Sequence, residues 1–205
     1  MKYKLTSETV QQGEITLHRI KALKDFGTVK TGDWGGLIES ENNLSQHGNA
    51  WVSDNARVYG NARVTANARV SGNARVSGNA RVTDTVRVTG SAWVTDNARV
   101  TDNARVTGTA RVTDNALVAD NGWVTDTVRV TGSAWVTGNA LVTANARVSG
   151  NARVSGNAWV SGTALVTDNA LVSANAWVTG TARVTDNALV ADNERVSDTV
   201  RVTDK

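Results

Sequence analysis

Residues 73–78 read Asn-Ala-Arg-Val-Ser-Gly, and units of this form run through most of the chain. Val occupies every sixth position from Val52 to Val202, 26 times without exception. Ala stands two residues before Val in 21 of these 26 units. Thr or Ser usually follows Val, then comes Asp, Gly or Ala, and then Asn, Thr or Ser. So strict a period makes the chain a repeat protein, and the repeat decides its fold.

The order Ala-x-Val-Thr alternates with a period of two, which is the period of a β-strand. Ala and Val then share the inward face, while Arg and Thr share the outward face. Asp54 and Gly60 follow at positions where a turn is expected, because Asp, Asn and Gly accept left-handed or tight backbone conformations. Each unit of six is therefore predicted to be a short strand followed by a corner.

Such a strand cannot bury its Ala and Val face alone, so the units must stack on one another. Coiling places them about 4.8 Å apart and turns the inward rows into a continuous core. A helix is excluded, because Val at every sixth residue would spread around a helix of 3.6 residues per turn. The slot before Val holds Arg, Trp or Leu, and we therefore predict that it faces solvent.

Composition restricts the functional classes. The 205 residues carry a net charge of +3, too weak by itself to imply a nucleic-acid partner. There is no Cys, and hence no disulfide or thiolate metal site. No apolar run approaches the roughly 18 residues of a membrane span, and the N-terminus lacks a secretory pattern. We expect a soluble protein without membrane contact, with the cytoplasm as the default location.

The units resemble those of the hexapeptide-repeat proteins, which fold as left-handed β-helices with three units per triangular coil. The resemblance implies an all-β, single-stranded parallel β-helix of eight to nine coils, about 40 Å long at β-spacing. A right-handed coil stays open, with the left-handed form preferred. The spacing of the Trp residues does not choose between two and three units per coil, because Trp51, Trp123 and Trp159 align under either count.

The segment before the repeats resembles the leader of certain bacterial and phage hexapeptide-repeat proteins of unsettled function. The matching stretches are residues 2–5, 23–26, 32–39 and 43–46. We divide the chain into an N-terminal capping segment, residues 1–48, and a repeat solenoid, residues 49–205. A cap is expected because the open end of a solenoid exposes a ladder edge and an apolar core.

Within the leader, Ile15, Leu17 and Ile20 predict a strand after a turn at residues 11–13. The glycine-rich stretch Gly32–Gly36 lacks the Lys-Ser/Thr ending of a phosphate loop, so we expect a tight turn there.

Many relatives in the resembled family are acyltransferases that use a His on a coil as general base. This solenoid has no His after His47, no inserted loop and no unit of irregular length. His18 and His47 both lie in the leader, at positions that favour structural roles. We therefore predict no catalytic residue and no cofactor, and an acyltransferase-like protein with weak or lost activity is the alternative.

Rows of arginines suggest a second possible function, the binding of a polyanion. At 18 residues per coil, one outward row contains Arg57, Arg75, Arg111, Arg129, Arg147, Arg183 and Arg201, interrupted by Trp93 and Leu165. Guanidinium groups about 4.8 Å apart could follow a polyanion. Asp stands at twelve corners, and we expect these carboxylates to neutralise the row. Nucleic acid or another polyanion is therefore disfavoured against a solvated surface.

Two further candidates are also disfavoured. Asp84, Asp102 and Asp120 fall on one corner of successive coils, where a cation could bind, but no recognised loop motif surrounds them. No metal site is predicted. Ice binding would need a face of Thr rows free of charge, whereas Thr here lies beside Arg on every face.

The sequence favours a non-enzymatic structural or binding scaffold that presents a regular rod surface. Self-association, as a trimer or end to end, is an open expectation. Residues 83–95 recur identically as residues 125–137, which indicates either recent amplification of a repeat or a design that imitates one.

Overall fold

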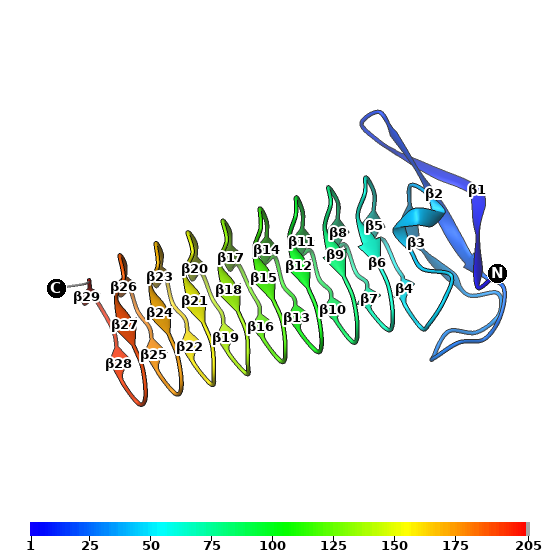
Figure 1. The fold of residues 1–205 in the computed structure, drawn as a ribbon. Coiled ribbons are helices and arrows are strands. Elements are labelled where there is room, and N and C mark those ends of the chain that lie inside the picture. Colours follow the sequence, from blue (N-terminus) through cyan, green and yellow to red (C-terminus); the bar gives the residue numbers. More distant parts are fainter. Residues whose placement is uncertain (204–205) are drawn as a thin grey trace.

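The computed structural model describes residues 1–203 and confirms an all-β parallel solenoid of about nine coils (Figure 1). Each short strand pairs in parallel with the strand 18 residues away, as Val52 does with Val70 and Val58 with Val76. Three units therefore form one coil, as the resemblance implied. Within residues 1–203 the one helical segment is the 3-10 helix η1 (Glu41–Asn43). The left-handed sense stays a prediction.

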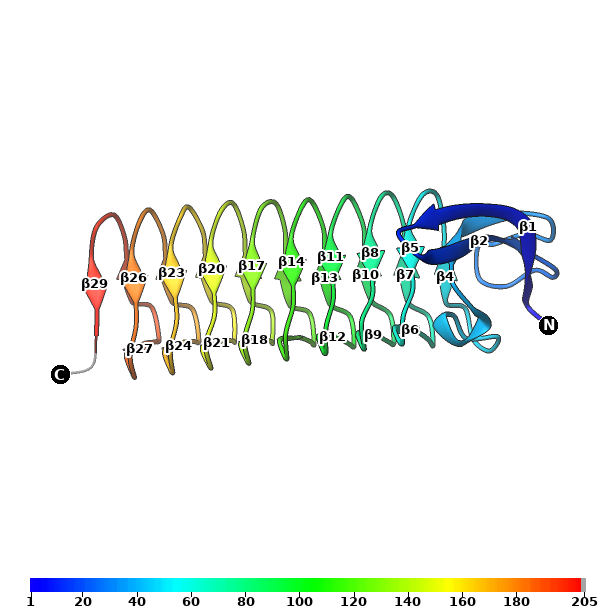
Figure 2. The same cartoon turned by 90° about the horizontal axis from the view of Figure 1, so that it is seen from above.

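The strands of the coils stack into three faces, which we name by their outward residues (Figure 2). The basic face contains β5 (Arg57–Val58), β8 (Arg75–Val76), β11 (Trp93–Val94), β14 (Arg111–Val112), β17 (Arg129–Val130), β20 (Arg147–Val148), β23 (Leu165–Val166), β26 (Arg183–Val184) and β29 (Arg201–Val202). The tryptophan face contains β4 (Trp51–Val52), β7 (Arg69–Val70), β10 (Arg87–Val88), β13 (Arg105–Val106), β16 (Trp123–Val124), β19 (Leu141–Val142), β22 (Trp159–Val160), β25 (Trp177–Val178) and β28 (Arg195–Val196). The third face contains β6 (Arg63–Val64), β9 (Arg81–Val82), β12 (Arg99–Val100), β15 (Leu117–Val118), β18 (Trp135–Val136), β21 (Arg153–Val154), β24 (Leu171–Val172) and β27 (Leu189–Val190).

The core is built almost entirely from the repeated Val and Ala. Every sixth-position Val from Val52 to Val190 is completely buried, and so are nearly all of the Ala residues two places earlier. Each buried Val stabilises the fold by about 1.5–3 kcal/mol relative to an exposed one. The outward slot is solvent-facing as predicted, with one exception: Trp51 is buried under Tyr3 and Phe26 of the leader.

The corners adopt the predicted left-handed conformation. Every corner residue from Asp54 to Asp198 has φ between 54° and 70°, whether it is Gly, Asp or Ala. Most residues that follow a corner donate their backbone N–H to the corner carbonyl of the next coil, as Asn55 does to Gly72 at 3.0 Å. Because all these donors point the same way along the axis, the first coil presents a ring of free carbonyls to the leader.

The leader consists of a β-hairpin and a third strand, which together cover the first coil. β1 (Tyr3–Gln12) and β2 (Ile15–Ala22) pair antiparallel around a turn at residues 13–14, which confirms the predicted strand. The predicted turn is displaced, because Gln11 and Gln12 belong to β1. β3 (Trp34–Ile38) then continues the basic face beside β5, with Leu37 opposite Arg57.

The tight turn expected over Gly32–Gly36 is wrong, because only Gly32 lies in a turn. Gly35 and Gly36 belong to β3, which packs directly on the first coil. A Cβ on Gly35 would lie 2.6 Å from the Trp51 ring, and one on Gly36 would lie 2.7 Å from the Ala56 carbonyl oxygen. The glycines therefore allow close packing of the cap and do not shape a loop.

Three leader side chains donate to the ring of carbonyls at the first coil. Lys2 Nζ donates to Ala50 at 2.8 Å, and Asn43 Nδ2 donates to Gly60 at 2.9 Å and to Ala62 at 3.0 Å. Burial, with a smaller effect from Lys24, lowers the pKa of Lys2 to about 8.

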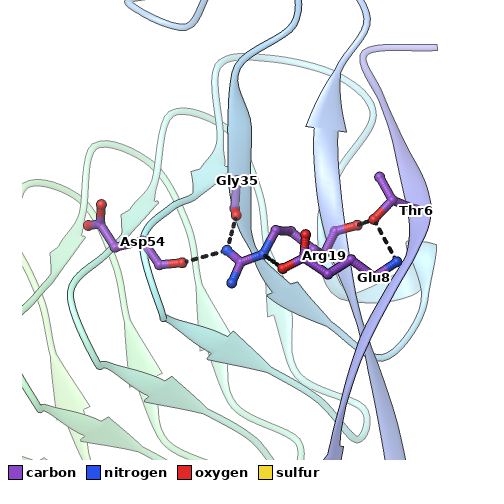
Figure 3. A network of polar contacts seen from close by, with 5 residues as sticks. All are labelled: Thr6, Glu8, Arg19, Gly35 and Asp54. Atoms are coloured by element: carbon purple, nitrogen blue, oxygen red, sulfur yellow. Dashed lines mark hydrogen bonds and ion pairs between the residues drawn. The ribbon is translucent and has the colours of Figure 1, made fainter.

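Arg19 is the third donor. Its Nη1 binds the carbonyls of Gly35 at 2.9 Å and Asp54 at 3.1 Å, while its Nε pairs with Glu8 at 2.6 Å (Figure 3). Thr6 completes this network by donating its hydroxyl to the Arg19 carbonyl. The leader thus closes the carbonyl end of the solenoid through side chains as well as through strand pairing.

Candidate functional site

The structure brings the predicted arginine row together on the basic face. Neighbours in the row lie in register, as Arg129 pairs with Arg147 and Arg183 with Arg201. Arg57 and Arg75 are half-buried near the leader, and the other members, Arg111, Arg129, Arg147, Arg183 and Arg201, are exposed. Stacked strands set the side chains about 4.8 Å apart. The outcome is a row of arginines along the rod, interrupted at Trp93 and Leu165.

Within residues 1–203 no corner carboxylate forms a direct ion pair with an arginine of this row, and the expectation that the carboxylates neutralise the row stays a prediction. Within residues 1–203 the ion pairs are Arg19–Glu8 and Lys30–Asp25, both in the leader, and none involves a repeat arginine. Corner Asp side chains instead point along the axis toward the next coil, where they accept hydrogen bonds from its backbone. Asp114 Oδ2 accepts the backbone N–H of Gly132 at 2.9 Å, and Asp120 Oδ2 accepts that of Gly138 at 2.9 Å.

Asp126 shows how firmly a corner carboxylate is held. The Thr143 hydroxyl donates to it at 2.5 Å and the Ala144 amide at 3.1 Å. These two hydrogen bonds, the hydroxyl first, lower the pKa of Asp126 below its ordinary value. The Asp126 carboxylate therefore connects its own coil to the next, with Oδ2 directed at a backbone amide.

One edge of the basic face has carboxylates at three of its nine corners and a long uncharged stretch between two of them. It is the edge shared with the tryptophan face, and its corner residues are Asp54, Gly72, Gly90, Gly108, Asp126, Ala144, Gly162, Gly180 and Asp198. Between Asp126 and Asp198 three successive corners carry no charge. Arg147 and Arg183 therefore follow uncharged corners on this edge, Ala144 and Gly180.

A shallow groove follows this uncharged stretch, and we call it the basic groove. It measures about 360 Å³ where Asn145, Arg147, Thr163, Leu165, Thr181 and Arg183 line it. It continues into a second hollow lined by Thr181, Arg183, Thr199 and Arg201. Thr163 and Thr181 donate their hydroxyls to the carbonyls of Gly180 and Asp198, which holds these side chains at the rim.

The same edge is hollowed again beside the leader. Asn55, Arg57, Asn73 and Arg75 line this part together with Arg19, Val10 and Leu37. The Arg57 guanidinium donates to the Gln12 side chain of β1. Further along, the ring of Trp93 lies between Arg75 and Arg111, with guanidinium carbons 5.2 and 4.8 Å from its centroid. Cation–π contact of this kind keeps both charges in the row.

Sequence reasoning identified the arginines but missed the polar rim beside them. The residue after the corner is mostly Asn on the other two edges, where Asn side chains form ladders such as Asn121–Asn139–Asn157. On the groove edge that position is instead Thr or Ser at residues 91, 109, 127, 163, 181 and 199. Writing the sequence in rows of 18 would have revealed this difference.

The other candidate sites stay apart from the groove. His18 lies half-buried in β2, with its Nδ1 3.3 Å from the Thr6 carbonyl oxygen, and His47 is exposed in the leader. Asp84, Asp102 and Asp120 do share a corner, but the carboxylates of Asp84 and Asp102 each contact the backbone N–H of the following Asp, at 3.4 Å. No group of three potential metal ligands occurs in the described part of the chain.

Comparison with known families agrees with the fold. Five stretches match the family model described as YdcK Beta solenoid repeat, namely residues 50–64, 56–72, 68–84, 74–90 and 146–162. These matches and the structure together identify a β-solenoid repeat protein. No curated protein matches the chain. None of the helical segments in residues 1–203 has the length and apolar character needed to cross a membrane.

Proposed function

We propose that this protein is a non-enzymatic scaffold whose basic face binds a linear polyanion. The observation that carries the proposal is the separation of charges within residues 1–203: no row arginine forms an ion pair, whereas several corner carboxylates, such as those of Asp114 and Asp120, accept backbone N–H groups. A row of free guanidinium groups displaces counterions from an anionic chain, which favours binding at low salt.

The rim of the basic groove supports the same ligand class. Thr163, Thr181 and Asn145 provide hydroxyl and amide groups beside Arg147 and Arg183. Guanidinium groups bind phosphate, sulfate or carboxylate oxygens through two parallel N–H donors. The groove is open and runs along the rod, so it suits an extended polymer better than a small enclosed substrate.

The alternatives receive less support from these contacts. An acyltransferase-like function would need His18 or His47 as general base, and neither lines the basic groove. An ice-binding face would need Thr rows without charge, whereas the rim Thr residues alternate with arginines. Head-to-tail assembly through the carbonyl end would have to displace Lys2, Arg19 and Asn43 from the first coil, so the proposal does not include it. A trimer stays a prediction.

The test is binding of a fluorescein-labelled heparin fragment, followed by anisotropy over a range of salt concentrations. A triple variant, Arg129→Leu with Arg147→Leu and Arg183→Leu, should bind about tenfold more weakly and with a shallower salt dependence. Leu is compatible with this row, because Leu165 already belongs to it. Inorganic polyphosphate and oligothymidylate, added as competitors, distinguish sulfated, phosphate and nucleic-acid ligands.

The matched control changes Arg63, Arg81 and Arg99 of the third face to Leu, which removes the same charge. This control should retain most of the affinity. Equal loss in the two triple variants would reduce the effect to net charge, and an unmodified protein that fails to bind any of the three polymers would overturn the proposal.

A further inference from the structure

The leader extends the basic face by two strands, and one of its residues continues the arginine row. Arg19 of β2 lies opposite Leu37 of β3. Leu37 in turn lies opposite Arg57 of β5, which lies opposite Arg75 of β8. Residues paired in this way share one side of a sheet. The row of the basic face therefore continues into the leader as far as Arg19, with Leu37 as an interruption.

At the junction of the leader and the coils this row borders a concave pocket of about 240 Å³, which we call the leader pocket. The residues that line it are Val10, Arg19, Leu37, Asn55, Arg57, Asn73 and Arg75. The tip of the β1–β2 hairpin reaches β5 (Figure 2), where the Gln12 side chain accepts a hydrogen bond from Arg57. A polymer that follows the row along the rod therefore meets the leader at this pocket.

The leader pocket contains two guanidinium groups without a counter-charge. Arg19 pairs with Glu8 at 2.6 Å, which compensates its charge. Arg57 and Arg75 are half-buried and lie side by side, and neither forms an ion pair within residues 1–203. Asp54, at the nearest acidic corner, directs its Oδ2 to a backbone N–H of the next coil at 2.9 Å. Like charges that face each other across two strands, partly removed from water, are unfavourable unless an anion lies between them.

Neutral partners orient these two guanidinium groups. The side-chain carbonyl of Gln12 accepts from Arg57, and the ring centroid of Trp93 lies 5.2 Å from the guanidinium carbon of Arg75. Neither partner supplies a full negative charge. The charges are thus held in place before any ligand arrives, which lowers the entropy cost of binding one.

Two amide groups lie beside these charges. Asn55 and Asn73 occupy the same corner position of successive coils, but their side chains form no hydrogen bond with each other within residues 1–203. On another edge of the same coils, Asn61 does donate to Asn79, at 3.1 Å. The amide N–H groups of Asn55 and Asn73 are therefore available to a ligand. Guanidinium and amide donors gathered around one pocket suit the oxygens of a tetrahedral anion.

We propose that the leader pocket binds a terminal phosphate monoester of the polyanion, so that the leader fixes where the bound polymer ends. This assignment rests on the function proposed above and narrows its ligand to a polymer with a phosphate terminus. A phosphate monoester carries a charge of about −1.5 to −2 at pH 7 and three acceptor oxygens. The uncompensated charges of Arg57 and Arg75 match that of the monoester, whereas a sulfate monoester or an internal phosphodiester carries a single negative charge.

Isothermal titration calorimetry at low salt, with phenyl phosphate as the probe, tests the pocket. We expect one phenyl phosphate per chain, bound about tenfold more tightly than phenyl sulfate. Arg57→Leu should weaken phenyl phosphate binding at least about tenfold. The matched control, Arg129→Leu, removes the same charge from the same row and should leave the affinity unchanged. Leu165 already belongs to this row, so both variants should fold.

A second variant leaves every charge and the Gln12 contact in place. Asn73→Ser removes one amide donor, and Ser91 occupies the same position in the next coil, so the variant should fold. Its affinity for phenyl phosphate should fall about threefold. Equal affinities of the Arg57→Leu and Arg129→Leu variants would overturn the proposal, as would equal affinities for phenyl phosphate and phenyl sulfate.

The terminus is tested with fluorescein-labelled oligothymidylate that does or does not carry a 5′-phosphate. The phosphorylated form should bind more tightly to the unmodified protein, and Arg57→Leu should abolish the difference. Absence of a difference in the unmodified protein would overturn the proposal. The triple variant of Arg129, Arg147 and Arg183 should still bind phenyl phosphate normally. A failure of the leader pocket is therefore distinguishable from a failure of the basic face, which heparin binding reports.

Discussion

At the scale of single residues, the corners show how local backbone geometry and packing between coils act together. All corners from Asp54 to Asp198 are left-handed, a conformation that costs an L-residue roughly 1–2 kcal/mol and costs Gly little. Asp recovers part of this cost through a hydrogen bond to the next coil, as at Asp114. Ala at positions 66, 144 and 174 has no polar side chain with which to do so.

We therefore expect Ala174→Gly to stabilise the protein by about 1 kcal/mol, because Gly removes the left-handed penalty. Gly156→Ala, one coil earlier on the same corner, should destabilise it. Its new Cβ would lie 2.8 Å from the backbone N and 2.9 Å from the Cα of Ala174. Thermal unfolding followed by circular dichroism measures both shifts. A higher melting temperature for Gly156→Ala would contradict this account of the corners.

At the scale of structural elements, the cap depends on a few donors at the carbonyl end of the solenoid. Asn43 of η1 is completely buried, donates to the Gly60 and Ala62 carbonyls, and accepts the Ser40 backbone N–H. Leu37, Glu39 and Ser45 add backbone donors to the same ring of carbonyls. The leader is therefore joined to the first coil by polar contacts that a generic apolar cover would lack.

Asn43→Asp keeps the shape of the side chain but replaces its donor with a negatively charged acceptor. Two buried carbonyls lose their partner and face a carboxylate, so we expect destabilisation of about 3 kcal/mol or more. Asn42→Asp, at the exposed neighbouring position, adds the same charge and should change stability little. Denaturant unfolding monitored by tryptophan fluorescence, to which Trp51 contributes from beneath the leader, measures the unfolding midpoints of both variants. Similar midpoints for the two variants would show that Asn43 does not hold the cap.

The repeat predicted its elements well, and the leader was predicted only in part. Every sixth-position Val from Val52 to Val196 lies in the core and every described corner is left-handed, because these features depend on contacts that each unit repeats. The glycines of β3 were misassigned to a turn. Their reason is the closeness of Trp51 and Ala56, which are distant in sequence.

At the scale of the whole molecule, function depends on which units share a face. The number of residues between two units decides whether they do. Units of six are interchangeable in fold, but only units 18 residues apart lie side by side. The basic face and the tryptophan face differ because Arg, Trp and Leu are distributed unevenly among the three rows.

Two deletions distinguish what the fold requires from what places a residue on a given face. Removing residues 139–144 deletes one unit and moves every later unit to the next face, so Arg147, Arg183 and Arg201 leave the basic face. Removing residues 139–156 deletes one full coil and keeps all later residues on their faces. We expect both variants to retain their β circular dichroism, because the Val period is intact.

The sequence by itself determined the coil, its inward Val and Ala rows, its corners and the position of the arginine row. Each of these follows from chemistry that one six-residue unit contains and that every other unit repeats. Only the tertiary structure decided where the corner carboxylates point, how the leader closes the carbonyl end, and which outward residues form a groove or a pocket. These features depend on contacts between coils and between the leader and the first coil, and a pattern read along a single unit does not contain them.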